Sequence, residues 1–111
     1  HFQDCNEFGM SFEFISCDLN NSSFYKTKIR NTRFSNSKLK EVDFVECDLT
    51  NSIFDDCDLY EALFDNTNLE KVDFQTSYNY SIDPERNRLK KTKFSSNGLS
   101  GLLKKYDIII Y

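Results

Sequence analysis

Residues 47–76 read CDLTN-SIFDD-CDLYE-ALFDN-TNLEK-VDFQT, six units of five in which the third residue is always Leu or Phe and the first is always small. We call this third residue the centre of its repeat. Stepping by five in both directions extends the pattern from 19 to 74, with a large apolar centre at each of twelve steps. A chance run of this length has a probability on the order of one in ten million, so the period is a property of the fold.

A period of five fits neither a helix nor a flat strand. Five residues turn an α-helix by about 500°, which would spread the centres around it. In a flat strand, odd spacing places successive centres on opposite faces. The period is explained if each unit is one side of a coil with a corner after it, because the centre and the small residue two before it then both face inward.

The centres alternate between Leu or Ile and Phe, so each kind recurs every ten residues. Four sides of five would close one coil of 20 residues and stack like side chains, with neighbouring backbones about 4.8 Å apart. The sequence therefore predicts an all-β fold, a quadrilateral β-helix of about four to five coils. The predicted columns are Leu19, Leu39 and Leu59; Phe24, Phe44 and Phe64; Ile29, Leu49 and Leu69; and Phe34, Phe54 and Phe74.

The predicted β-helical domain covers residues 1–95, with regular repeats over 11–76. We expect 77–95 to be a degenerate last coil of unchanged length, because Leu89 and Phe94 return to the register.

Two parts of this domain do not follow the repeat. Tyr78, Tyr80 or Ile82 is expected to fill the interior of the last coil. At the other end, Phe2, Cys5 and Phe8 suggest an earlier coil that is out of phase by one residue.

Residues 96–111 follow a different period, which predicts a short helix and then an Ile-rich strand. Apolar residues recur at the i, i+3, i+4, i+7 spacing of one helix face, and Ser96 or Asn97 can cap the helix start. We expect this unit to close the open end of the β-helix as a lid, to pair with a second copy in a homodimer, or to do both. The residues assigned to the cap and dimer contact are Leu99, Leu102, Leu103, Tyr106, Ile108 and Ile110.

Units 47–51, 57–61 and 62–66 resemble those of the pentapeptide-repeat family, which read small–Asp/Asn–Leu/Phe–x–x. The resemblance covers about residues 12 to 94 and implies a right-handed quadrilateral β-helix. The ending, from 80 to 110, looks like that of Qnr-type quinolone-resistance proteins and a microcin immunity relative. This second resemblance implies a tail-to-tail dimer that binds DNA gyrase or topoisomerase IV as a mimic of duplex DNA.

An acidic belt is predicted to surround the rod over just more than one coil. The span from 41 to 65 contains nine acidic residues and no Lys or Arg, and the occupied interior forces their side chains outward. Such a belt can offer charge to a basic partner. Basic residues lie directly before the belt and again from 86 to 93, so attraction between oppositely charged coils is the plainer explanation. The belt residues are Glu41, Asp43, Glu46, Asp48, Asp55, Asp56, Asp58, Glu61 and Asp65.

The composition argues against catalysis and against cofactors. The single histidine is His1, which excludes His-based triads and metal sites, and three glycines are too few for a phosphate-binding loop. Cys17, Cys47 and Cys57 occupy the small inward position, where we expect free, buried and inert thiols. Free thiols suit a reducing compartment, so the sequence favours the cytoplasm.

The remaining bulk properties limit the partners. The net charge of −4 argues against direct binding of nucleic acid, and no apolar run is long enough to span a membrane. Because the chain opens at His1 rather than Met, we expect it to derive from a longer or processed protein. The sequence therefore predicts a non-catalytic rod that acts as a protein-interaction surface, with gyrase mimicry as the alternative.

Overall fold

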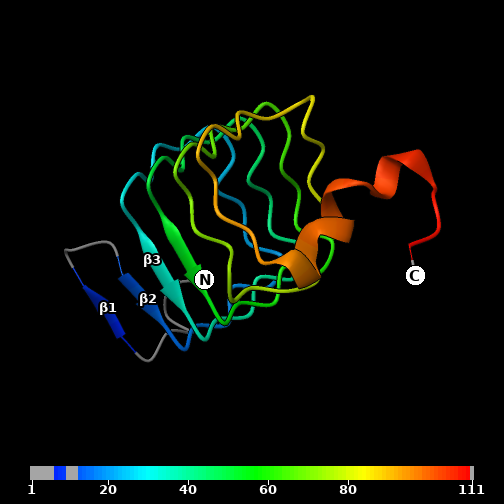
Figure 1. Cartoon of the computed structure of the whole chain (residues 1–111). Coiled ribbons are helices and arrows are strands. Elements are labelled where there is room, and N and C mark those ends of the chain that lie inside the picture. The colour runs from blue at the N-terminus through cyan, green and yellow to red at the C-terminus, as the bar shows by residue number, and fades with distance from the viewer. Residues whose placement is uncertain (1–6, 10–12, 111) are drawn as a thin grey trace.

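The computed structural model describes residues 7–9 and 13–110, with side chains from residue 13 onward. Figure 1 shows a wound chain with short strands on one side and helical turns at one end. A single four-stranded sheet has the order β1-β2-β3-β4. The elements are β1 (Glu7–Gly9), β2 (Glu13–Ile15), β3 (Arg33–Ser35), β4 (Ile53–Asp55) and the 3₁₀ helices η2 (Ser96–Leu102) and η3 (Lys104–Tyr106).

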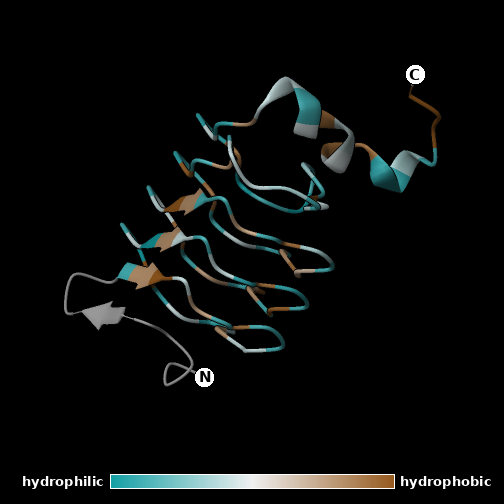
Figure 2. Cartoon of the chain, turned by 90° about the horizontal axis from the view of Figure 1, so that it is seen from below, coloured by the Kyte–Doolittle hydropathy of each residue, from teal (hydrophilic) through white to brown (hydrophobic). Residues whose placement is uncertain are grey.

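The chain repeats its path every 20 residues. Parallel pairing aligns Phe14 with Phe34 and Phe34 with Phe54. Isolated parallel bridges keep the same offset from Asp18↔Lys38 to Asp73↔Lys93, and Figure 2 shows the resulting turns stacked one above another. The backbone pairing thus repeats at the 20-residue interval that the sequence predicted for one coil.

A left-handed residue marks the corner after nearly every side. The second residue after each centre from Phe14 to Leu69 has a positive φ, between 49° and 65°, and none of these residues is Gly. Asn tolerates this region better than most residues because its short amide can bond the local backbone. Asn accordingly supplies five of these corners, namely Asn21, Asn31, Asn36, Asn51 and Asn66.

The predicted columns form the core. The centres Leu49, Phe54 and Leu59 are fully buried, and Phe64 is 7% exposed. Phe54 stacks on Phe34 at 4.8 Å and on Phe74 at 5.1 Å between ring centroids. Phenylalanines from opposite sides meet edge to face, as Phe44 and Phe54 do at 5.7 Å. Interior placement is therefore confirmed for the centres from Leu19 to Phe74 except Ile29, which is only partly buried.

The small inward residue has a role beyond its size. From Cys47 onward, the hydroxyl or thiol at this position donates to the carbonyl of a centre residue in the preceding coil. Thr67 Oγ1 donates to the Phe44 carbonyl at 2.6 Å, and Ser52 Oγ donates to the Ile29 carbonyl at 3.1 Å. Buried carbonyls need such partners, which explains why Ser, Thr and Cys fill this position more often than Ala.

The last coil returns to the predicted register at Phe94, and two of the three candidate residues fill its interior. Phe94 stacks on Phe74 at 5.5 Å. Tyr80 and Ile82 fill the interior with exposures of 3% and 1%, whereas Tyr78 is half exposed.

The N-terminal prediction was wrong for Phe8. β1 runs antiparallel to β2, with Phe8 opposite Phe14, so these residues form a hairpin arm rather than an earlier parallel coil. Phe2 and Cys5 lie outside the described residues.

The C-terminal helix and strand also differ from the prediction. Bonds from residue i+3 to residue i, such as Leu103 N–H to the Ser100 carbonyl at 3.1 Å, define 3₁₀ turns rather than an α-helix. Ser95 precedes η2 and makes no side-chain capping bond. Residues 108–110 form no strand, and Tyr111 lies outside the described part.

Two glycines allow η2 to lie against the end of the rod. A Cβ at Gly98 would lie 1.7 Å from the Tyr80 hydroxyl oxygen, and one at Gly101 would lie 2.3 Å from the Tyr80 carbonyl oxygen. The Gly101 carbonyl also accepts the Ile82 N–H at 2.9 Å, and Leu102 packs on the core. η2 is therefore held against the last coil. Across the described residues, no helix is both long and apolar enough to cross a bilayer.

Candidate interaction surface

Four of the nine belt carboxylates stand on corners. Glu41, Glu46, Asp56 and Glu61 are exposed and take left-handed backbone angles at the second residue after a centre. None of the four makes an ion pair with another described residue. Glu41 and Glu61 share one corner column, since the Glu41 N–H donates to the Tyr60 carbonyl at 2.9 Å.

Three other belt residues accept hydrogen bonds from the backbone of their own repeat. Asp43, Asp48 and Asp58 directly precede a centre and are half-buried. Their Oδ1 atoms accept the N–H two residues later, at 2.8 Å for Asp43 and at 3.1 Å for Asp48 and for Asp58. These are Asx turns, which explains why Asp and Asn recur before the centre.

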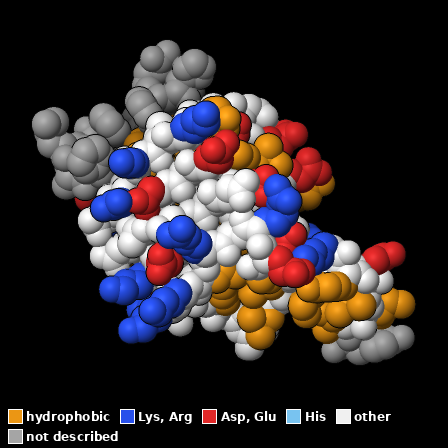
Figure 3. All heavy atoms as spheres, turned by 90° about the horizontal axis from the view of Figure 1, so that it is seen from above, with side chains coloured by type: hydrophobic (Ala, Val, Ile, Leu, Met, Phe, Trp, Pro, Cys, Tyr) orange, Lys and Arg blue, Asp and Glu red, His pale blue; other side chains and the backbone are white. Residues whose placement is uncertain are grey.

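Ion pairs between neighbouring coils neutralise much of the belt. The pairs are Asp48 with Arg30 at 2.6 Å, Asp55 with Arg33 at 3.2 Å, Asp58 with Lys40 at 3.6 Å, and Asp65 with Arg86. On the face in Figure 3, blue and red side chains are interleaved rather than separated. The attraction between oppositely charged coils that the sequence suggested is therefore present.

The pKa values of two belt residues reflect these contacts. Burial acts to raise the pKa of Asp48, but hydrogen bonds from Thr50 and the Arg30 guanidinium bring it below its ordinary value. The pKa of Asp65 is lowered mainly by its hydrogen bond from Arg86. Both groups are thus held as carboxylates by the protein itself, which leaves less of their charge for a partner.

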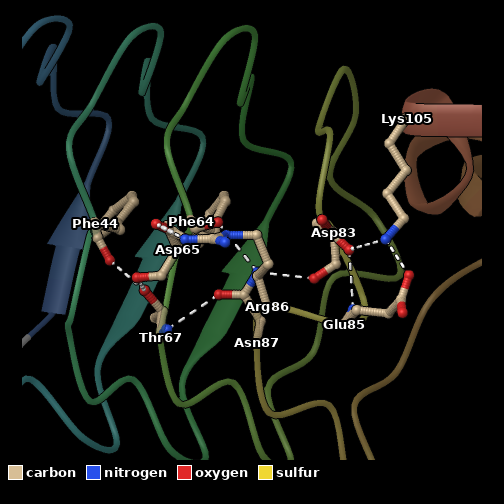
Figure 4. Close-up of polar contacts among 9 residues, drawn as sticks. All are labelled: Phe44, Phe64, Asp65, Thr67, Asp83, Glu85, Arg86, Asn87 and Lys105. Carbon is tan, nitrogen blue, oxygen red and sulfur yellow. Dashed lines mark hydrogen bonds and ion pairs between the residues drawn. The ribbon is translucent and has the colours of Figure 1, made fainter.

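A polar cluster replaces the regular repeat in the last coil, as Figure 4 shows. Asn87 takes the small inward position: Nδ2 donates to the Phe64 carbonyl at 3.1 Å, and Oδ1 accepts the Thr67 N–H at 3.0 Å. Lys105 of η3 pairs with Asp83 at 3.0 Å and with Glu85. We call Asp83, Glu85 and Lys105 the lid clamp, because they tie η3 to the last coil.

The predicted cap residues separate into two groups. Leu102 and Leu103 are half-buried, whereas Leu99, Tyr106, Ile108 and Ile110 are 46–56% exposed. Ile109, which the sequence analysis did not assign, is 79% exposed. Leu102 thus packs against the core, and the Tyr106 hydroxyl donates to Glu85 of the last coil at 3.2 Å. Leu99, Ile108 and Ile110 are about half exposed.

The cysteines do not all match the prediction. Cys17 is disulfide-bonded, so the expectation of a free thiol there was wrong. Cys47 and Cys57 are free and buried, and burial raises the pKa of the Cys57 thiol to about 12. The argument for a reducing compartment therefore loses its basis. Within the described part of the chain, no three His, Cys, Asp or Glu side chains are grouped to hold a metal ion.

Comparison with solved structures finds proteins of low identity. A pentapeptide repeat protein, Rfr23, from the cyanobacterium Cyanothece 51142 is 21% identical, with 78% of this chain and 62% of that chain covered and a TM-score of 0.36. One from the Arabidopsis thaliana thylakoid lumen is 16% identical, with coverages of 83% and 70% and a TM-score of 0.39. Full-length QnrB1, a plasmid-mediated fluoroquinolone resistance protein, is 14% identical, with coverages of 86% and 68% and a TM-score of 0.42.

The chain thus spans less than two thirds of the length of the cyanobacterial protein. No curated protein matches by sequence. A family model for the pentapeptide repeat region matches residues 9–83, which include most of the coils described above. With this match and its stacked coils of five-residue sides, the chain belongs to the pentapeptide repeat family.

Proposed function

We propose that this chain is a non-catalytic rod that acts as a protein-interaction surface. The observation that carries the proposal is the set of corner carboxylates without ion pairs, Glu41, Glu46, Asp56 and Glu61. Stacked coils fix the backbone of each corner, so a partner meets these charges with little ordering cost. Charges of fixed geometry give specificity and speed association with a basic surface.

A capture experiment with matched variants tests this proposal. The intact chain is immobilised and its host's soluble proteins are quantified after binding, in parallel with the double variant Glu46→Gln/Asp56→Asn. The control is Lys26→Gln, another exposed corner with positive φ. We expect a defined captured set that the double variant loses and the control retains. Equal capture by all three proteins would contradict the proposal.

Mimicry of duplex DNA towards DNA gyrase or topoisomerase IV is the second candidate. The span from 41 to 65, with nine acidic residues and no Lys or Arg, supports it, since a DNA-binding groove is basic. It ranks second because Asp48, Asp55, Asp58 and Asp65 are paired with cations of neighbouring coils. A supercoiling assay with added protein decides it: unchanged gyrase activity and unchanged quinolone sensitivity would remove this candidate.

We further propose that residues 96–111 form a dimer contact in addition to the lid. The exposed side chains of Leu99, Tyr106, Ile108 and Ile110 support this, since contiguous apolar surface commonly marks an interface. Light scattering should report a dimer that Ile108→Asp converts to a monomer. A monomeric parent chain would leave the lid as the tail's only role.

The proposal includes the right-handed winding and about four to five coils that the family resemblance implies. It also includes the division into a β-helix over 1–95 and a cap over 96–111. An experimental structure checks both: left-handed winding would contradict the proposal, as would a cap that packs away from the last coil.

A further inference from the structure

One side of a coil lacks the backbone pairing that the same side has elsewhere. The Phe24 N–H donates to the Asp43 carbonyl at 2.8 Å, and the Phe44 N–H donates to the Leu63 carbonyl at 2.9 Å. At the next coil, the Phe64 N–H has no hydrogen-bond partner among the described residues, and neither have the Glu61 N–H and the Ala62 carbonyl. We call residues 61–64 the open side.

The path of the next segment explains the open side. Tyr80 and Ile82 turn into the interior, and the Ile82 N–H donates to Gly101 of η2 rather than to the preceding coil. The yellow segment in Figure 1, near residue 80, accordingly stands out from the stack of coils. Regular bridging returns at Asn68↔Arg88. Tyr80 and Ile82 fill the end of the interior, and Ile82 bonds η2. This segment is therefore displaced from the parallel backbone pairing of the coils.

A hollow of about 660 Å³ lies over the open side. Leu63 forms part of its lining and is 55% exposed, at a position that Ser23 and Asp43 occupy in the preceding coils. Glu41 and Glu61 line one edge, and neither is paired with a cation among the described residues. The hollow therefore combines unpaired backbone groups, an apolar side chain and two carboxylates without an ion pair among the described residues.

These features match the groups that an extended peptide presents. An added strand offers backbone N–H and C=O groups in a row, and its alternate side chains point to one face. An apolar side chain can cover Leu63, and a neighbouring Lys or Arg can reach Glu41 and Glu61. Exposed strand edges are usually protected by Lys or Pro, whereas this edge carries neither.

We propose that the open side binds an extended, basic and β-branched segment of a partner protein, which adds a strand to the coil. The inference rests on the proposed role as a protein-interaction surface and names one binding site and the chemistry of its ligand. The expected ligand is a peptide because the open side offers unpaired backbone donors and an acceptor in register. A partner bound by charge attraction alone would leave these groups unpaired.

The test uses the full chain and a fluorescein-labelled Lys-Val-Lys-Val-Lys-Val peptide, with binding measured by fluorescence anisotropy. We expect saturable binding that drops about tenfold for the same peptide with N-methylated amides, which cannot complete the backbone bonds. Leu63→Asp, which restores the residue type of the preceding coil, and Glu61→Gln should each weaken binding severalfold. Both positions are exposed, so these variants retain the core. Asp56→Asn, a corner variant outside the hollow lining, should bind as the parent does.

Hydrogen exchange locates the peptide. Binding should slow exchange of the Glu61 and Phe64 amides and leave the Phe44 amide unchanged. Equal affinity of the N-methylated peptide would overturn the inference, as would equal weakening by Asp56→Asn. If the peptide fails while protein capture still depends on Glu46 and Asp56, the inference falls and the proposed function stands.

Discussion

The coils before residue 77 and the last coil, residues 77–95, share the 20-residue register but are held together by different contacts. In the earlier coils each side except the open side is bonded to the same side 20 residues on, and the Phe rings of one column stack on one another. The last coil has no coil after it, and it is closed by Tyr80, the glycines of η2 and the lid clamp. A repeat thus specifies the middle of a solenoid, whereas its end requires side chains outside the repeat.

The largest expected difference between the two regions is in the stability that a stacked Phe ring contributes. Phe54→Ala should lower the free energy of unfolding by about 3–5 kcal/mol, because it leaves a void between two stacked rings. Phe94→Ala, at a half-buried ring that stacks on Phe74, should cost less. Denaturant unfolding measures both values. Equal costs would mean that the last coil is packed as tightly as the middle ones.

The glycine contact at the lid gives the next effect. Gly101→Ala should cost about 1–3 kcal/mol, because a Cβ there meets the Tyr80 backbone rather than a flexible side chain. Ser100→Ala, at an exposed neighbour in η2, is the control and should change little. Thermal unfolding of the two variants makes the comparison, and a neutral Gly101→Ala would place η2 farther from the last coil.

The hydroxyl bonds within the regular coils give a smaller effect. Thr67→Val keeps the shape but leaves the Phe44 carbonyl without its donor, which should cost about 1 kcal/mol. Val72→Thr is the reverse change, because the equivalent Ser52 and Thr92 both donate to a carbonyl one coil earlier. Urea titration should show opposite signs for the two variants. Loss of stability in both would contradict the proposed role of this position.

The smallest effect is the acid sensitivity of the lid clamp. The pKa of Asp83 is lowered by the Glu85 backbone N–H and by Lys105, and that of Glu85 is lowered by Lys105 and Tyr106. A carboxyl group with a lowered folded-state pKa stabilises the fold above its unfolded value, which is about 4. It loses this contribution as pH falls through the folded value. Exchange of the Ile82 amide, which is bonded to Gly101, should therefore accelerate below about pH 4 relative to its intrinsic rate.

Lys105→Met should remove most of this acid dependence, because the clamp is then already broken at neutral pH. Lys104→Met, at an exposed neighbour without an ion pair among the described residues, should keep it. The same acid dependence in both variants would show that the clamp does not hold the lid.

The sequence predicted the coil, its columns and the return to register at Phe94, because the interior imposes a strict five-residue period. It did not predict the hydrogen bonds of Thr67 and its equivalents, although the many hydroxyl and thiol side chains at that position were a usable signal. The Asp residues before the centres were likewise assigned to a binding belt, whereas Asp48 and Asp58 bond their own backbone.

The ends were harder to predict because tertiary contacts decide them. Gly98 and Gly101 allow close approach to Tyr80, and the segment forms 3₁₀ turns although its apolar spacing is that of an α-helix. The open side had one sequence signal: Leu63 occupies a position where most repeats carry a polar residue. Its meaning depends on the path near Tyr80, which no local pattern reveals.

Amide hydrogen exchange of the unliganded chain tests most directly whether the ladder is continuous through Glu41–Phe44 and interrupted at the open side. We expect slow exchange for the Phe24 and Phe44 amides and fast exchange for the Phe64 amide, although all three rings are buried. Protection of Phe64 equal to that of Phe44 would contradict it.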